Sequence, residues 1–596
     1  SPIIDYSFNS VSTLVPYELD GQGRQRTGGE IARMIFFREG NLLNLGDDNQ
    51  HSQNITINFR PKLPLGKLSR YWENTGSYQV TYNWQNPLQP DPKITNVVKN
   101  ASWSSNIRYN ISLRYKNLFE DMFGIAEPSK SFVRPPIEDT VPRGFWKTIG
   151  SIFKTVFIDF EKVDFVFTQS SASNNPGVFG GTGFDNFWGR GFLWRESEER
   201  FGPSFAYQLG LVGSPHGSFS IVPSSRFPFF GFSTTVGRRP ENAILQENFT
   251  QRTTFEVKTT RQLWQGASLD LSWRSELGFN KNQTILTDSL GIPKFTNVIA
   301  MQSYSRTYLT LPTIFGINIF NNNIEHVIEL YNQQKEKILA SNLDSMRKNQ
   351  LLLQAISESF HTGLEAFSLF TGAAGKFLPG INWAFRWEGL EKWDLLKPIA
   401  PKRILIEHIY SSKYQENAQI NDNGKTIQGQ QVQYGFQPLI GVSVSFDEKK
   451  YKGVFTVTLR YNTTTNFMLN TISRSTIVRQ TTDELQAQAS YTLRGFEFPL
   501  FNLVLRNDIE FSFLGSYRSN KRATYDILNY TGEKGRTLDG NSQIIIEPRA
   551  RYSISNRVNA SFFMRYEGTF TEGAASPGFS NFQVGLDIRV SISGGR

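Results

Sequence analysis

Histidine, serine and acidic residues are the side chains here that could act in catalysis or bind a metal. His408 lies close to Ser411 and Ser412 in the stretch ILIEHIYSS, a spacing that could bring a general base near a nucleophile. A strand histidine beside serines is more often an ordinary lining residue, so we expect no catalytic residue and no enzyme. The five histidines are scattered, at positions 51, 216, 326, 361 and 408, and cysteine is absent. We therefore predict no metal site and no cofactor.

A second candidate is the glycine- and aromatic-rich block GVFGGTGFDNFWGRGF at residues 177–192. Glycine loops that bind phosphate need a preceding strand and a following helix, whose N-terminal amides face the ligand. No helical period follows the glycines here. We interpret the block as a compact loop whose glycines allow positive φ. Its aromatic side chains are candidate contacts for a partner or for lipid: Phe184, Phe187 and Trp188.

Charged residues elsewhere are interleaved with apolar ones at a period of two. About 16 segments show this alternation from residue 53 onwards, and many exceed ten residues, whereas soluble strands average about five to six. Aromatic residues make up 14% of the chain, yet mean hydropathy is −0.37. No apolar run approaches the roughly 20 residues of a membrane-spanning helix. The predicted strands centre on residues 57, 81, 111, 165, 209, 257, 271, 308, 406, 444, 457, 489, 511, 546, 562 and 588.

These strands predict an all-β fold, an antiparallel transmembrane β-barrel that forms part of a very large barrel. Short connections near Trp264, Lys450 and Ser555 alternate with longer ones. We assign the short turns to the periplasm, as is usual for such barrels. The predicted membrane-facing residues are Phe562, Met564, Tyr566, Phe582, Val584, Leu586, Ile588 and Val590, and the predicted lumen-facing residues are Arg565, Glu567, Asp587 and Arg589.

One segment departs from the strand pattern. Apolar residues recur at helical spacing from Ile324 to Tyr331 and from Leu352 to Phe360. We predict two or three helices in an insertion at residues 323–395, which the strand count places on the periplasmic side. Two roles stay open for it: a folded cover over the barrel rim, or a plug or docking element for a partner.

The block at 177–192, the ending MRYEGTFTEGAASPGFSNFQVGLDIRVSI and the Asn-, Tyr- and Phe-rich strands together resemble one family. They resemble the C-terminal part of the SprA (Sov) outer-membrane translocons of the Bacteroidota type IX secretion system. The likeness covers the whole chain and rests on the residue composition of the strands and on the order of the elements. It implies that residues 1–596 form a segment of a protein-conducting channel, which exports folded cargo proteins from the periplasm to the cell surface.

The resemblance also implies a bacterial outer-membrane location and a set of partners. These are the remaining part of the SprA barrel, a shuttle barrel at a lateral opening, a periplasmic plug protein, an inner-membrane motor, cargo with a C-terminal signal domain, and outer-membrane lipids. The net charge of +10 is small for 596 residues, so we expect no nucleic-acid partner. The alternative is a self-contained porin-like or nutrient-uptake barrel of roughly 16 strands. We predict instead that residues 53–61 and 582–592 do not pair.

Overall fold

The structure is a computed structural model. It describes residues 2–13, 24–37, 47–61, 66–87, 98–123, 160–179, 203–215, 219–223, 228–232, 239–310, 323–365, 380–421, 424–470, 476–500, 503–530, 535–555, 557–572 and 578–590.

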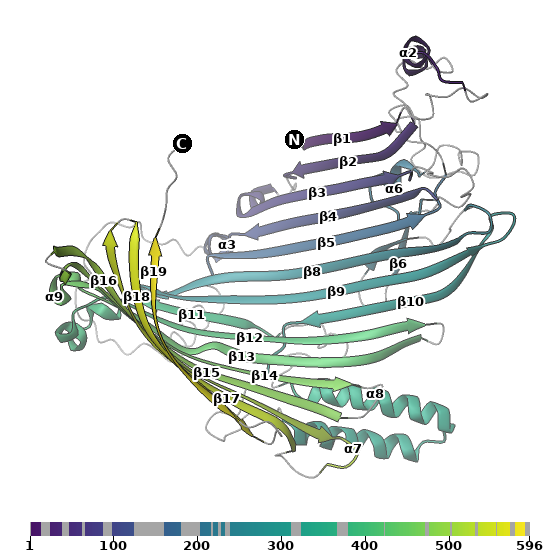
Figure 1. The fold of residues 1–596 in the computed structure, drawn as a ribbon. Helices are drawn as coiled ribbons and strands as arrows, with labels where there is room; N and C mark the ends of the chain where they lie inside the picture. The colour runs from purple at the N-terminus through teal and green to yellow at the C-terminus, as the bar shows by residue number, and fades with distance from the viewer. Residues whose placement is uncertain are drawn as a thin grey trace.

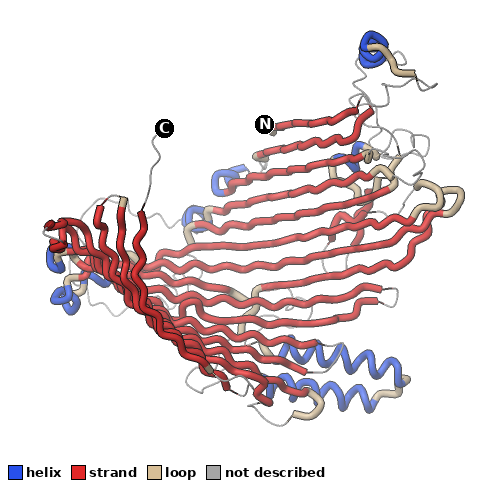
Figure 2. The backbone as a smooth tube through the Cα atoms, viewed as in Figure 1, coloured by secondary structure: helices blue, strands red, loops and turns tan. Residues whose placement is uncertain are grey.

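The described chain is built around one 17-stranded sheet that twists and curves across its width (Figure 1, Figure 2). All pairings between its described strands are antiparallel, and most strands pair with their sequence neighbour, while β5 pairs with β8. The strands before residue 240 are β1 (Ile3–Thr13), β2 (Asp47–Phe59), β3 (Trp72–Gln85), β4 (Asn100–Leu113) and β5 (Lys162–Pro176). Those that follow are β8 (Ile244–Trp264), β9 (Ala267–Thr287), β10 (Pro293–Arg306), β11 (Asn382–Glu388), β12 (Pro401–Asn421), β13 (Gly424–Phe446), β14 (Gly453–Asn470), β15 (Thr476–Leu500), β16 (Leu503–Asp526), β17 (Arg536–Ser555), β18 (Val558–Glu572) and β19 (Phe579–Val590).

Among the described strands, the two outermost ones, β1 and β19, each pair on one side only. β1 pairs with β2, and β19 pairs with β18. β2 has β1 on one side and β3 on the other, so residues 50–59 have no edge left for β19. Within the described residues, the segments 53–59 and 582–590 therefore do not pair, as expected.

Two helices, α7 (Ile324–Ala340) and α8 (Ser345–Gly363), form an antiparallel hairpin. Asn323 caps α7 by accepting a hydrogen bond from the His326 amide at 2.8 Å, and Asp344 caps α8 through the Arg347 amide at 3.3 Å. The remaining helical segments are α2 (Gly28–Phe37), α3 (Tyr115–Phe123), α6 (Phe205–Gln208), α9 (Glu448–Tyr451), η2 (Gly66–Tyr71), η4 (Leu390–Lys392) and η5 (Asp394–Ile399). No helix in the described part of the chain is long and apolar enough to span a membrane.

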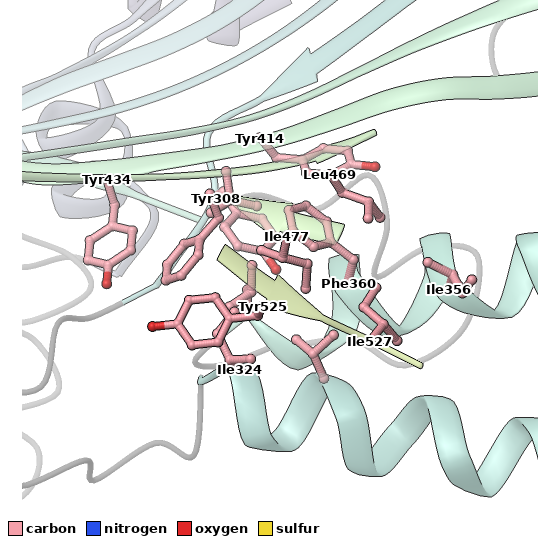
Figure 3. Close-up of a cluster of buried hydrophobic side chains, with 14 of the residues drawn as sticks. Tyr308, Ile324, Ile356, Phe360, Tyr414, Tyr434, Leu469, Ile477, Tyr525 and Ile527 are labelled. Atoms are coloured by element: carbon pink, nitrogen blue, oxygen red, sulfur yellow. The ribbon is translucent and has the colours of Figure 1, made fainter. Parts of the chain in front are cut away.

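The largest hydrophobic cluster lies between this hairpin and the sheet (Figure 3). The helices contribute Ile324, Val327 and Ile328 from α7 and Ile356 and Phe360 from α8. Side chains from the ends of β12 to β16 pack against them: Tyr414, Val432, Leu469, Ile477 and Tyr525. The predicted helical periodicity is thus the buried face of a hairpin.

Most predicted strands are confirmed, but the one centred on residue 308 is misplaced, because β10 ends at Arg306, and the one centred on Leu209 is wrong. Phe205–Gln208 is the short helix α6, and Ser204 caps it by accepting from the Tyr207 amide. The apolar alternation around Leu209 reflects burial of this segment against the sheet. Gly210 then turns the chain at φ +66, packed so closely that a Cβ there would lie 3.0 Å from the Trp103 ring.

Four strands are absent from the predicted set: β1, which lies before residue 53, and the shorter strands β6, β7 and β11. β6 (Phe219–Pro223) and β7 (Pro228–Phe232) form a separate hairpin, inside a connection that is long enough to hide one. β11 lies within the insertion predicted as helical, so the helices do not extend over the whole of 323–395.

The predicted alternation of short and long connections is only partly correct. β8 and β9 are joined at Gln265 and Gly266, and α9 lies in the short turn between β13 and β14. We call the end of the sheet with these two turns the short-turn end, and the opposite end the far end. The far end also has short connections, at 422–423 and 288–292. Connection length alone therefore does not assign the two ends to two compartments.

Candidate functional site

Strand register divides the last strands into two faces. Phe562 pairs with Leu586 and Tyr566 with Phe582, whereas Arg565 pairs with Gln583. Opposed residues of an antiparallel pair share a face, so the two predicted sets separate completely. We call the face with Phe562, Met564, Tyr566, Phe582, Val584, Leu586, Ile588 and Val590 the apolar face, and the face with Arg565, Glu567, Asp587 and Arg589 the polar face.

Apolar side chains on the apolar face form rows that begin at the short-turn end. In β16 the row runs from Ile509 to Tyr517 at every second residue, and in β17 it runs from Ile544 to Tyr552. Each row spans about nine residues, close to the 9–11 residues that a tilted strand needs to cross a bilayer. Beyond Tyr517 the same face continues with Ser519 and Lys521.

Ion pairs link neighbouring strands across the polar face. Arg565 contacts Glu567 at 3.1 Å and Glu547 at 3.5 Å, and Arg549 contacts Glu547 at 2.9 Å. Gln543 extends the network by donating to Glu567 at 2.8 Å. Two of the four predicted lumen-facing residues, Arg565 and Glu567, therefore belong to a network of alternating charge.

The central strands carry a second network on the same face. Arg386 of β11 contacts Asp270 of β9 at 2.8 Å and Glu407 of β12 at 3.6 Å. Arg460 of β14 contacts Glu407 from the other side at 3.1 Å. A third group joins Arg252 and Arg274 to a shared Glu276, at 2.8 and 3.0 Å. The polar face thus presents partly exposed, mostly paired charges from β8 to β18.

β10 and β11 lie end to end in the same position of the sheet, and both pair with β9 on one side and β12 on the other. β10 ends where Arg306 pairs with Ser275, and β11 begins where Asn382 pairs with Ser272. The chain leaves the sheet through this break, continues into α7 and α8, and then returns. Gly380 lies where the returning chain touches the outgoing chain, because a Cβ there would overlap the backbone of Leu309.

Backbone and side-chain hydrogen bonds close the break. The Thr307 amide donates to the Arg274 carbonyl at 2.8 Å, and the Tyr308 amide donates to Ser412 Oγ at 3.2 Å. The Ser412 amide in turn donates to Asn382 Oδ1 at 2.9 Å. The sheet therefore stays connected although its middle strand is interrupted.

A buried polar group joins the helical hairpin to the break. Arg306 Nη2 lies 3.0 Å from Glu365 Oε1 and 3.0 Å from His361 Nε2, and the Tyr308 hydroxyl donates to the His361 carbonyl. The Arg306 and Glu365 side chains are 0% and 9% exposed. Burial raises the pKa of the Glu365 carboxyl, and Arg306 opposes this shift. We infer that the pair fixes the position of α8 more than it adds stability, since burying both charges is costly.

Residues 203–215 form a second cover on the apolar face, over the far-end parts of β3 and β4. The Tyr207 hydroxyl lies within hydrogen-bond distance of two acceptors, Asn175 Oδ1 at 2.7 Å and the Ala101 carbonyl at 2.9 Å. Trp103 Nε1 donates to the Val212 carbonyl at 3.0 Å. Complete burial raises the pKa of Tyr207 well above its usual value.

The hairpin lies at the far end of the sheet, opposite α9 (Figure 1). It covers Leu469 and Ile477, next to the connection between β14 and β15. The predicted periplasmic position came from the rule that short turns face the periplasm. The short-turn rule and a periplasmic hairpin therefore cannot both hold.

Structure separates the residues first considered for catalysis. His408 Nδ1 lies 2.7 Å from the Leu439 carbonyl, and its ring stacks near Trp383. Ser412 Oγ is engaged with Asn382 and Tyr308, and Ser411 points to the other face. The candidate contacts Phe184, Phe187 and Trp188 lie outside the described residues.

Sequence reasoning missed Arg306, Glu365 and the break itself. One signal for β11 is present in the sequence, since the pattern WAFRWE at 383–388 alternates large aromatic residues with Ala384, Arg386 and Glu388. Comparisons with protein-family models and with curated proteins give no match for this chain.

Proposed function

We propose that this chain forms part of the wall of a wide aqueous passage across a bacterial outer membrane. The apolar face meets lipid and the polar face meets water. The observation that carries the proposal is the nine-residue apolar row, repeated on neighbouring strands opposite a face with ion-pair networks. A lysine or arginine on the lipid side at mid-depth costs about 2–4 kcal/mol, and the rows of β15 to β17 contain none.

The substrate class that we propose is folded protein, exported from the periplasm to the cell surface by the type IX secretion system. Resemblance to the SprA (Sov) family supports this. The free edges of β1 and β19 support a wall that is completed by further strands, because passage width grows with strand number. The shuttle barrel, the periplasmic plug protein, the inner-membrane motor and cargo with a C-terminal signal domain are the corresponding proposed partners.

A porin-like or nutrient-uptake barrel is the second candidate. The seventeen strands fill 16 positions across the sheet, because β10 and β11 share one, and this is enough for a porin-sized barrel; such a barrel needs β1 to pair with β19. Cysteines at Tyr6 and Leu586, both on the apolar face, test this. Disulfide formation in membranes would support the porin, and its absence alongside normal insertion would support the open wall.

The membrane position can be tested by cysteine labelling, because the natural chain has no cysteine. Single cysteines replace residues 582–590 one at a time in the membrane-inserted chain. We expect a membrane-impermeant maleimide to label Asp587→Cys and Arg589→Cys, and to spare Leu586→Cys and Ile588→Cys until detergent is added. Equal labelling at all positions would contradict the proposal.

The export function needs a separate test. A photo-crosslinking amino acid at Arg565, on the polar face, should capture cargo during secretion. The same group at the adjacent Tyr566, on the apolar face, should capture none. Cargo captured equally from both positions, or from neither in secreting cells, would contradict a protein-conducting passage.

A further inference from the structure

We propose that the outer edge of β19 is covered by a membrane-spanning β-strand from outside residues 1–596, and that this partner strand carries a base beside Asp587 and an acid beside Arg589. The partner strand lies antiparallel to β19 and has apolar side chains on the apolar face. This inference rests on the membrane position proposed above and adds the chemistry of the partner strand to it.

The outer edge of β19 is open to a further strand. Among the described strands, β19 pairs with β18 alone. An edge strand presents a row of unpaired N–H and C=O groups, and such groups are costly to leave in lipid. Phe582 and Leu586 on the apolar face are 64% and 65% exposed. A strand added at this edge therefore continues both the backbone pairing and the apolar row.

Charged residues on the polar face follow one pattern across the sheet. Where two of them lie directly opposite each other in the described strands, one is an acid and the other is a base. Such opposed pairs stabilise a sheet, whereas opposed like charges destabilise it. The pairs include Asp164 with Lys258, Glu256 with Arg274, Arg386 with Glu407, Glu484 with Arg518, Glu510 with Arg551 and Arg522 with Asp539.

Asp587 and Arg589 have no such neighbour on β18. Asp587 lies opposite Ser561, and Arg589 lies opposite Asn559. Both charged side chains are exposed, and neither forms an ion pair with the other or with any further described residue. The outer side of β19 is therefore the place where a base and an acid can complete the pattern.

The described strands do not supply this base and acid. In the 17-stranded sheet, β1 is the other strand that pairs on one side only, and its sequence IIDYSFNSVST contains one acid, Asp5, and no base. Pairing with β1 would leave Asp587 without a cation. A second copy of the chain, joined through its own β19 and centred on Ile588, would oppose Asp587 to Arg589. It would also leave the β1 edge of both copies uncovered in lipid, so we favour a strand from a further segment that can cover both edges.

Synthetic strands test the edge in the full chain carrying Ile588→Cys, reconstituted in vesicles together with one of two peptides. Both peptides alternate valine with serine and differ only in the segment placed opposite residues 587–589. Glu-Cys-Lys sets Glu opposite Arg589 and Lys opposite Asp587 in an antiparallel pair, and Lys-Cys-Glu exchanges the two charges. We expect disulfide formation with the introduced cysteine to be about fivefold greater for Glu-Cys-Lys, because opposed charges attract across a strand pair and like charges repel.

A chain with exchanged charges is the matched control. Asp587→Arg/Arg589→Asp, combined with Ile588→Cys, keeps the composition and should reverse the preference between the two peptides. If this variant does not insert, Asp587→Asn/Arg589→Gln should abolish the preference. Equal cross-linking of both peptides to the naturally charged chain, no cross-linking of either, or an unchanged preference in the exchanged chain would overturn the inference.

Other occupants of the edge give different results. A disulfide-linked dimer of the Ile588→Cys chain in the absence of peptide would identify a second copy as the occupant. A disulfide within the Tyr6→Cys/Leu586→Cys chain would identify β1, and either result overturns the proposed partner strand. Insertion of the chain without any preference between the peptides overturns this inference alone, whereas failure of the natural chain to insert overturns the proposed function as well.

Discussion

The two ends of the apolar face differ although the same strands build both. In β14, Leu459 is 45% exposed at the short-turn end, whereas Leu469 is 2% exposed at the far end. In β16 the corresponding residues are the exposed Phe513 and the buried Tyr525. Both residues of each strand lie on the same face, because strand side chains alternate. An apolar row therefore does not by itself reveal what covers it.

The far end resembles the core of a water-soluble protein. The α7–α8 hairpin and residues 203–215 pack on it, and a buried ion pair lies there, between Arg239 Nη2 and Glu247 at 2.6 Å. The short-turn end instead keeps its rows exposed among the described residues. The strands reach 25 residues in β15, more than twice what a bilayer crossing requires. One strand thus has a covered part at the far end and an exposed part at the short-turn end.

The largest expected effect is at the covered end. Phe360→Ala removes a fully buried ring from the cluster between hairpin and sheet, and should weaken docking of the hairpin by about 3–5 kcal/mol. Hydrogen exchange of α7 and α8 in the full chain measures this. Leu353→Ala, at a residue 48% exposed on α8, is the control and should have little effect. Equal loss of protection in both variants would show that the hairpin is not held by this cluster.

The second-largest effect on stability is expected at the short-turn end, where the apolar rows are exposed. Ile546→Arg places a charge in the apolar row of β17 and should destabilise the inserted chain by about 2–4 kcal/mol. Ile545→Arg is the matched control, because the adjacent residue lies on the polar face opposite Glu567. Urea unfolding of the vesicle-inserted chain gives both values. Similar costs would mean that the two faces meet the same solvent.

A third prediction concerns the buried Glu365 at the covered end. Its folded-state pKa is raised by burial, so its contribution to docking is fully present below its ordinary pKa of about 4.3. That contribution is lost as the pH rises through the folded-state pKa. Hairpin protection should therefore fall as the pH rises from about 4.3, and Glu365→Gln should remove this dependence. An unchanged pH profile in the variant would assign the effect to another group.

The smallest effect is expected on the polar face. Arg565→Gln breaks pairs whose side chains are 38% and 25% exposed, and such pairs contribute about 0–1 kcal/mol. Arg589→Gln is the control, because Arg589 forms no ion pair within the described strands. A loss above about 2 kcal/mol for Arg565 in chemical unfolding would mean that this network holds the sheet together.

Much of the sheet was predictable because a two-residue period survives wherever one face is apolar and the other polar. The separation of Phe582 and Leu586 from Asp587 and Arg589 follows from that period alone, and register confirms it. The helices were predictable from the spacing of Ile324, Val327 and Ile328. The prediction of a strand around Leu209 is wrong because a helical segment buried on several sides can also show alternating apolar residues.

Sequence by itself determined which residues share a face, since backbone geometry sets the period of two along every strand. Tertiary structure alone decided what each part of that face meets. Arg306 and Glu365 are 59 residues apart, and no local pattern links them. Their contact, the break between β10 and β11, and the covered far end all arise from packing between distant segments, which short-range periodicity does not encode.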